Sequence, residues 1–245
     1  MNTPHYTEEE SNSGIGGVRV AIVRDNEDPE NLGRVKLEFP WRDADDESYW
    51  ARIATDMTGD EYGTYYLPEI GDEVLVGFEN GDIHNPIVIG SLWSGNRPPP
   101  ETNDDGENDI RAIETRSGHR IEFDDNEQEG AVRIETNAGH EIVLDDDSGS
   151  ESIRLEDKSG NVVEMDSVDN AVSISAKQEI SLQAPTIELS ADGEVNIESN
   201  GTVDISGDAQ TDVSSKGQLN LESNGLMGID ATGMLTIRGA MIQLN

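Results

Sequence analysis

The stretch VNIESNGTVDISGDAQTDVSSKGQLNLESNGL, residues Val195–Leu226, decides the fold because it divides into four blocks of eight residues. An apolar residue stands near the first and third place of nearly every block, and Gly201, Gly217 and Gly225 fall where the chain must turn. Apolar residues two apart predict a strand with one buried face, and glycine permits the tight turn that follows. The unit is therefore one short strand and one turn.

The same period of eight continues on both sides of this stretch, from about Ala171 to Ile237, with Thr211 as an exception among the apolar positions. Because each block presents one apolar stripe, we expect these positions to form the core of an elongated, repetitive structure. The predicted core residues are Ile187, Leu189, Val195, Ile197, Val203, Ile205, Val213, Leu219, Leu221, Ile229, Leu235 and Ile237.

One block of this kind cannot fold alone. Burying two apolar side chains contributes about 3 to 6 kcal/mol, whereas ordering eight residues costs roughly 8 to 16 kcal/mol. A single-chain β-helix needs three or more apolar faces per coil, and this pattern supplies one face. Three intertwined chains would supply three faces around one dry interior and leave no lateral edge strand exposed. The sequence therefore predicts a trimeric β-helix or β-prism.

A second repeat precedes the first. Gly118, Gly139 and Gly160 stand 21 residues apart, within RSGHRIEFDD, NAGHEIVLDD and KSGNVVEMDS. Each of these segments is followed by a second short alternating run, AVRIE, SIRLE or AVSIS. We therefore expect two strands in every 21 residues of this region.

Short strands separated by turn residues also fill the N-terminal third of the chain. Five alternating or apolar runs predict a small closed barrel of the OB type, at residues 18–23, 33–39, 50–55, 72–78 and 86–92. The fold class is thus all-β, with an N-terminal OB barrel and a C-terminal trimeric needle. The expected domains are a disordered tail at 1–14, the OB domain at 15–94, a Pro- and Asp-rich linker at 95–109, and the needle at 110–245.

Composition limits the possible partners. The 245 residues include 52 acidic and 16 basic side chains, for a net charge of −36. Nucleic acid is excluded as a partner because phosphate binding needs clustered Lys and Arg. Among a disordered acidic chain, an acidic tail and a folded protein adapted to concentrated salt, the alternating Val, Ile and Leu favour the third, and a halophilic host follows. We expect synthesis in the cytoplasm as a soluble protein, since the start lacks a secretory signal and no long apolar run occurs.

Four segments resemble one family. They are DPENLGRVKLEFPW (Asp28–Trp41), YWARIAT (Tyr49–Thr55), LPEIGDEVLVGFENGD (Leu67–Asp82) and NPIVIGSL (Asn85–Leu92), and the similarity continues through TRSGHRIEFDD and the ending IRGAMIQLN. They resemble the OB module of contractile-tail spikes, meaning phage baseplate protein V and the VgrG proteins of type VI secretion. The resemblance implies a homotrimer whose needle leads the tail tube and helps to puncture a target envelope, which it meets only transiently.

The same resemblance implies two further partners. The large hub domains that precede the OB module in full-length VgrG proteins are not seen before Gly17, so we expect a separate hub protein at the OB end. A small PAAR-type cap protein is expected on Met241, Ile242, Gln243, Leu244 and Asn245. The chain is assigned to the virion or injection particle, and the choice between a virus and a cell-encoded device stays open.

No catalytic, metal-binding or cofactor-binding residue is predicted. The chain has no cysteine and no defensible Ser-His-Asp arrangement, and we expect His119 and His140 to be solvent-exposed in turns. The linker is too short for the lysozyme domain of some related spikes, so we expect no enzyme. The main alternative function is a trimeric tail-fibre or adhesin module that binds surface glycans, although Phe123 is the last aromatic residue of the chain. A polysaccharide-cleaving β-helix is a third hypothesis, which the abundant acids do not test.

Overall fold

The computed structural model describes residues 14–42 and 47–243. Contacts divide the chain into two compact units, Met1–Ser181 and Leu182–Asn245. The predicted disordered tail lies outside the described residues except for Gly14, and so do Leu244 and Asn245 of the predicted cap contact. The predicted domain limits at residues 94 and 109 stay predictions.

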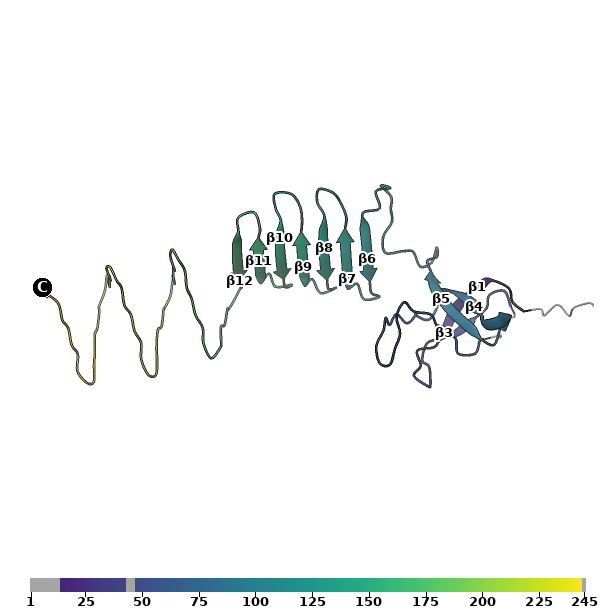
Figure 1. Ribbon diagram of the computed structural model, residues 1–245, viewed down its shortest axis with the longest axis horizontal. Coiled ribbons are helices and arrows are strands. Elements are labelled where there is room, and N and C mark those ends of the chain that lie inside the picture. The colour runs from purple at the N-terminus through teal and green to yellow at the C-terminus, as the bar shows by residue number, and fades with distance from the viewer. Residues whose placement is uncertain (1–13, 43–46, 244–245) are drawn as a thin grey trace, which may run out of the picture. The chain divides into compact units, whose positions relative to one another are not determined.

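Five strands form the first sheet in the order β2-β1-β4-β5-β3 (Figure 1). They are β1 (Val18–Asp25), β2 (Lys36–Glu38), β3 (Arg52–Ile53), β4 (Glu73–Phe78) and β5 (Pro86–Leu92), and a 3-10 turn, η1 (Glu79–Gly81), joins β4 to β5. All neighbours are antiparallel except β3 and β5. Val35 and Ala51 exchange backbone hydrogen bonds of 3.0 and 2.7 Å, which join the two ends of the sheet. The sheet therefore curls toward a barrel, as the sequence predicts.

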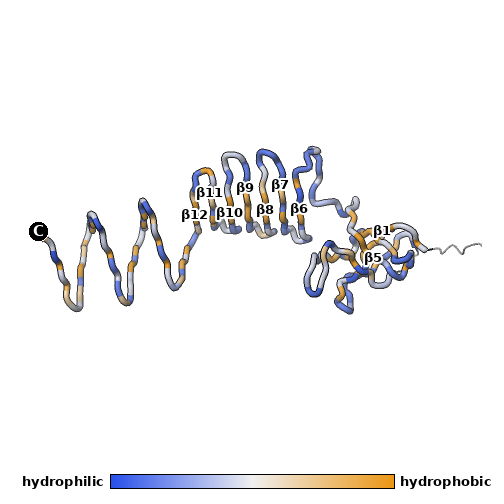
Figure 2. The backbone as a smooth tube through the Cα atoms, in the orientation of Figure 1, coloured by the Kyte–Doolittle hydropathy of each residue, from blue (hydrophilic) through white to orange (hydrophobic). Residues whose placement is uncertain are grey.

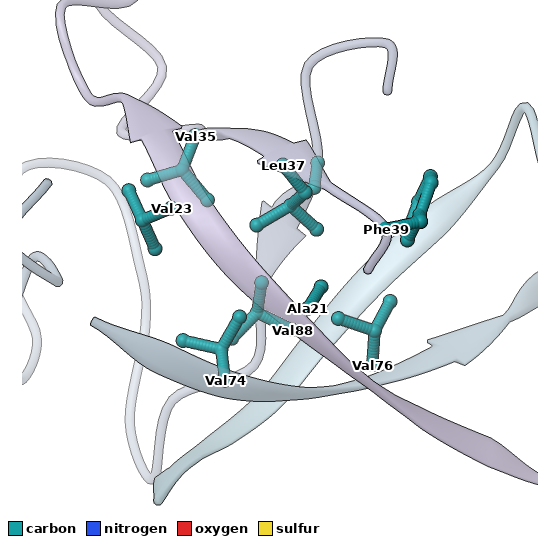
Figure 3. Close-up of a cluster of buried hydrophobic side chains, with 9 residues drawn as sticks. Ala21, Val23, Val35, Leu37, Phe39, Val74, Val76 and Val88 are labelled. Atoms are coloured by element: carbon teal, nitrogen blue, oxygen red, sulfur yellow. The ribbon is translucent and has the colours of Figure 1, made fainter. Parts of the chain in front are cut away.

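One cluster of small apolar side chains fills this barrel (Figure 3). Val74 and Val76 point inward from β4, with Leu75 between them on the opposite face, as the pleat requires. Every member of the cluster is 0–2% exposed, so any truncation would open a cavity. The members are Ala21, Val23, Val35, Leu37, Phe39, Ala51, Val74, Val76 and Val88.

A buried carboxylate organises the turn between β1 and β2. Asp28 accepts hydrogen bonds from the backbone N–H groups of Glu30 and Leu32, both at 3.0 Å. It also receives a bidentate pair from the Arg34 guanidinium, with both bonds at 2.8 Å. The hydrogen bonds from Arg34 are the main reason that the pKa of Asp28 lies well below its usual range. The DPENLGR motif is thus a turn whose first and last residues, Asp28 and Arg34, form an ion pair.

Seven antiparallel strands form the second sheet, in which each strand pairs with the next along the chain (Figure 1). They are β6 (Ile110–Glu114), β7 (Arg120–Asp124), β8 (Ala131–Glu135), β9 (Glu141–Asp145), β10 (Ser152–Glu156), β11 (Val162–Asp166) and β12 (Ala171–Ser175). The 21-residue repeat is therefore one β-hairpin plus its return connection. Its constant spacing places Gly118, Gly139 and Gly160 in equivalent turns with φ of +80° to +83°, a region that glycine adopts without strain.

The turns on one edge of this sheet are bonded to one another. The side chain after each turn glycine accepts a hydrogen bond from a backbone N–H of the following turn. His119 Nδ1 accepts from Asn137 at 3.3 Å, and His140 Nδ1 accepts from Lys158 at 3.4 Å. Asn161 Oδ1 accepts from Lys177 in the same way at 2.9 Å. His119 and His140 are exposed, as predicted, but they also serve as these acceptors.

The eight-residue blocks behave differently. Among the described residues beyond Ser175, no paired strand occurs, and the chain runs as a regular series of bends (Figure 1). Orange apolar positions recur along these bends (Figure 2). Ser199, Ser215 and Ser223 each accept a hydrogen bond through Oγ from the N–H of the glycine two residues later, at 3.1 to 3.2 Å. The turns are thus built locally by Ser-x-Gly chemistry, whereas the straight segments have no ladder within one chain.

Candidate subunit interface

The second sheet has two chemically different faces. The pairing register places Ile121, Ile134 and Ile142 on one face, because β7 pairs with β8 and β8 with β9 at these residues. The same face holds Leu155, which pairs with Ile142 on β9 and Val163 on β11. Apart from Arg111 on β6, this face is wholly apolar. Its members are Ile113, Ile121, Phe123, Val132, Ile134, Ile142, Leu144, Ile153, Leu155, Val163, Met165, Val172 and Ile174.

This apolar face is uncovered in the single chain. Ten of its side chains are between 39% and 69% exposed, whereas those of the barrel core are 0–2% exposed. A hollow of about 550 Å³ lies on it, lined by Ile134, Ile142, Leu155, Val163, Ile174 and Ile180, among others. A sheet that is apolar over a whole face must bury it against another layer. We therefore expect this face to be covered by another layer.

The opposite face is charged and satisfied within the chain. Arg120 donates to Glu122 and Glu114 at 2.7–2.8 Å and also contacts Glu101 of the linker. Partial burial lowers the pKa of Arg120, but its hydrogen bonds to these carboxylates outweigh burial and raise it. Arg133 bridges Glu122 and Asp124, and Arg154 bridges Glu156 and Glu164. With the cations of this face already paired, we expect it to face solvent.

The eight-residue blocks repeat the same division. Gln210 donates to Asp212 at 2.7 Å and Gln218 donates to Asn220 at 2.8 Å, so residues two apart share a face. Val213, Leu219 and Leu221 must then lie on the opposite face. The twelve core residues predicted from the sequence are 52–75% exposed in the single chain. That they meet on a trimer axis stays a prediction.

The sequence assigns residues 110–245 to the trimeric needle, but the core residues predicted from it lie only in the eight-residue blocks and include none of the apolar face of the second sheet. A signal is present in the sequence, since apolar and charged residues alternate with period two in IEF, VRI and IRL. The 21-residue spacing predicts pairs of strands but does not give their register. The register assigns the face, and it depends on turn length.

Comparison with known proteins fits this geometry. Residues 19–93 match the type VI secretion system and phage-baseplate injector OB domain. Residues 131–219 match the phage baseplate V C-terminal trimerisation domain. The match spans most of the uncovered apolar sheet and the first of the eight-residue blocks, which we call octads. The chain belongs to the contractile-tail spike family. Its all-β fold, with an OB domain followed by a trimerisation domain, is confirmed, and the match to a trimerisation domain supports a homotrimer.

Several curated proteins are similar to part of this chain. The type VI secretion system spike protein VgrG3 of Vibrio cholerae is 37% identical over 75 residues, which is 29% of this chain and 7% of that protein. The spike protein VgrG5 of Pseudomonas aeruginosa is 46% identical over 77 residues, or 29% of this chain and 10% of that protein. The actin cross-linking toxin VgrG1 of V. cholerae is 39% identical over 74 residues. The matches therefore span a tenth or less of the length of these relatives.

Other sites were searched for within residues 14–42 and 47–243. No group of three or more His, Asp or Glu side chains there is placed to hold a metal ion. No helix in the same residues is long and apolar enough to cross a membrane.

Proposed function

We propose that three copies of this chain form the central spike of a contractile injection device or phage-like tail, with a needle that leads the tube and helps to puncture a target envelope. The observation that carries this proposal is the uncovered apolar face of β6–β12, of which β8–β12 lie within the matched trimerisation domain. Three such faces can close around one axis, and the Arg-carboxylate face then points outward.

Stiffness is the mechanical consequence of this arrangement. Axial load on a needle is resisted when strands of different chains interlock and no lateral edge is free to splay. The octads provide the interlocking part, because their backbone has no ladder within its own chain. Pairing with other copies would satisfy those N–H and C=O groups, which would be costly to leave unpaired when buried.

The hub and cap partners belong to the same proposal. A hub protein would hold the OB end, and a PAAR-type cap would contact the predicted residues Met241–Asn245. The spike itself would be non-catalytic, since both matched segments are injector and trimerisation domains. The glycan-binding alternative gains no support from the octads, because no aromatic residue follows Phe123.

Two measurements test the proposal. Sedimentation and electron microscopy of the purified chain in concentrated KCl should show an elongated trimer with a shaft of roughly 70 Å, from about fifteen strands at ~4.8 Å each. Particles assembled without this chain should lose the ability to permeabilise target envelopes. Particles that still permeabilise them as fast as intact ones would refute the proposal.

A further inference from the structure

The outward side of the octads changes character along the chain. The first outward position of successive octads holds Glu194, Thr202, Gln210 and Gln218, all polar. The Gln210–Asp212 and Gln218–Asn220 hydrogen bonds fix which face this is. In the next two octads the same position holds Leu226 and Met234.

Exposure separates these two residues from the core positions. Leu226 is 95% exposed and Met234 is 89% exposed, against 52–75% for the twelve predicted core residues. Near the end of the described chain the register slips by one residue, because Met241 is 86% exposed whereas Ile242 is 51% exposed. Met241 therefore continues the outward series. We call Leu226, Met234 and Met241 the apolar collar.

Trimer geometry turns the collar into a closed belt. In a three-faced needle, each octad of a chain lies on the next face, and each row advances about 4.8 Å. Three rows on three chains therefore place apolar side chains on every face of the shaft over about 10 Å. The matched trimerisation domain ends at residue 219, so the collar lies beyond it.

We infer that the collar is a lateral docking site for a separate protein. This partner would be socket-shaped and would contact all three faces of the shaft. This inference rests on the proposed spike and extends its cap contact from Met241–Asn245 to the side of the needle. Methionine suits such a contact because its flexible thioether adapts to an irregular apolar surface.

A lipid bilayer fits the same belt poorly. The belt is about a third of the hydrocarbon thickness of a bilayer, which is about 30 Å. Asp230 and Arg238 share the outward face of the collar rows by strand alternation, and lipid would strip water from both charges. A protein socket can supply partners for these charges while it covers the apolar side chains.

The test uses a photo-crosslinking amino acid placed at residue 226 or 234 in particles assembled from the chain's own gene cluster. Residues 210 and 218, at the same outward position, are the matched controls. We expect one protein to be cross-linked from both collar positions, with at least about tenfold lower yield from the controls. That protein, once purified, should bind one per trimer, and L226S/M234S should weaken binding about tenfold or more while Q210S/Q218S leaves it unchanged.

The outcomes separate the two proposals. Sedimentation first checks that each variant is a trimer, and microscopy checks that it enters the particle. Cross-links to lipid, to other copies of this chain alone, or in equal yield from collar and control positions would overturn the collar inference and leave the spike standing. A chain that is absent from the particle would overturn both.

Discussion

Leu155→Ala tests whether the apolar face of β6–β12 is buried between chains. Leu155 is 42% exposed in the single chain and pairs across the face with Ile142 and Val163. Full burial of a leucine contributes about 1.5–3 kcal/mol, so covering the remaining 42% contributes about 0.6–1.3 kcal/mol per chain. Three chains lose about 2–4 kcal/mol per trimer, before any cavity term.

This loss has a measurable size. It corresponds to a change of about 30- to 900-fold in the trimer dissociation constant. Because that constant scales with the square of the protein concentration, the concentration at half-dissociation should rise by about 5- to 30-fold. Sedimentation over a dilution series in concentrated KCl measures this midpoint directly.

Val143→Ala is the matched control. Val143 lies one strand away from Leu155, on the charged face, where its cross-strand neighbours are Arg133 and Arg154. It removes apolar volume from the same sheet without touching the proposed interface, so its dissociation midpoint should stay near that of the unmodified chain. An unchanged midpoint for Leu155→Ala, or an equal shift for both variants, would refute the assignment of the faces.

Three further predictions concern turns and salt. His140→Ala should speed hydrogen exchange of the Lys158 amide about fivefold, as expected for the loss of a hydrogen bond worth about 1 kcal/mol. His140→Asn should preserve the protection of this amide, because Asn161 accepts the equivalent backbone hydrogen bond one repeat later. Equal exchange rates in the two variants would contradict this acceptor role. Arg34 lowers the pKa of Asp28, so the stabilisation by Asp28 is fully present above the unfolded carboxyl pKa of about 3.9 and fades as pH falls below it. The loss of melting temperature caused by Asp28→Asn should therefore be constant from about pH 5 upward and should shrink in acid. A loss that grows in acid would reverse the assigned sign. Dilution from about 1 M to 0.1 M KCl extends the screening length from about 3 to 10 Å. Repulsion within a chain of net charge −36 then increases, so the melting temperature should fall on dilution. A melting temperature that does not depend on salt would remove the case for salt adaptation.

Local chemistry made much of this fold predictable. The five barrel strands were predicted near their observed positions, because Val-rich alternation and glycine turns act over a few residues. The glycines at 118, 139 and 160 likewise announced the hairpins of the second sheet. Strands β2 and β3 are shorter than predicted, because pairing across the barrel, rather than composition, sets where a ladder ends.

The contacts that join distant residues could not be predicted. Arg120 contacts Glu101 from the linker, and among 52 acids no pattern marks that carboxylate as its partner. The acceptor role of His119 depends on how far the next turn lies along the sheet edge. The apolar collar required the register of the octads, which the hydrogen bonds of Gln210 and Gln218 supplied.

The sequence by itself determined that this protein is all-β and rich in acidic side chains, and it predicts that its repeats cannot stand as single chains. Those properties follow from composition and from periods of two and eight residues, which act locally. Only the tertiary structure decided which face of β6–β12 is bare, which face is held by Arg120, Arg133 and Arg154, and where the outward side of the shaft becomes apolar. A face is a property of strand register, and register is fixed when turns and cross-strand pairs form together.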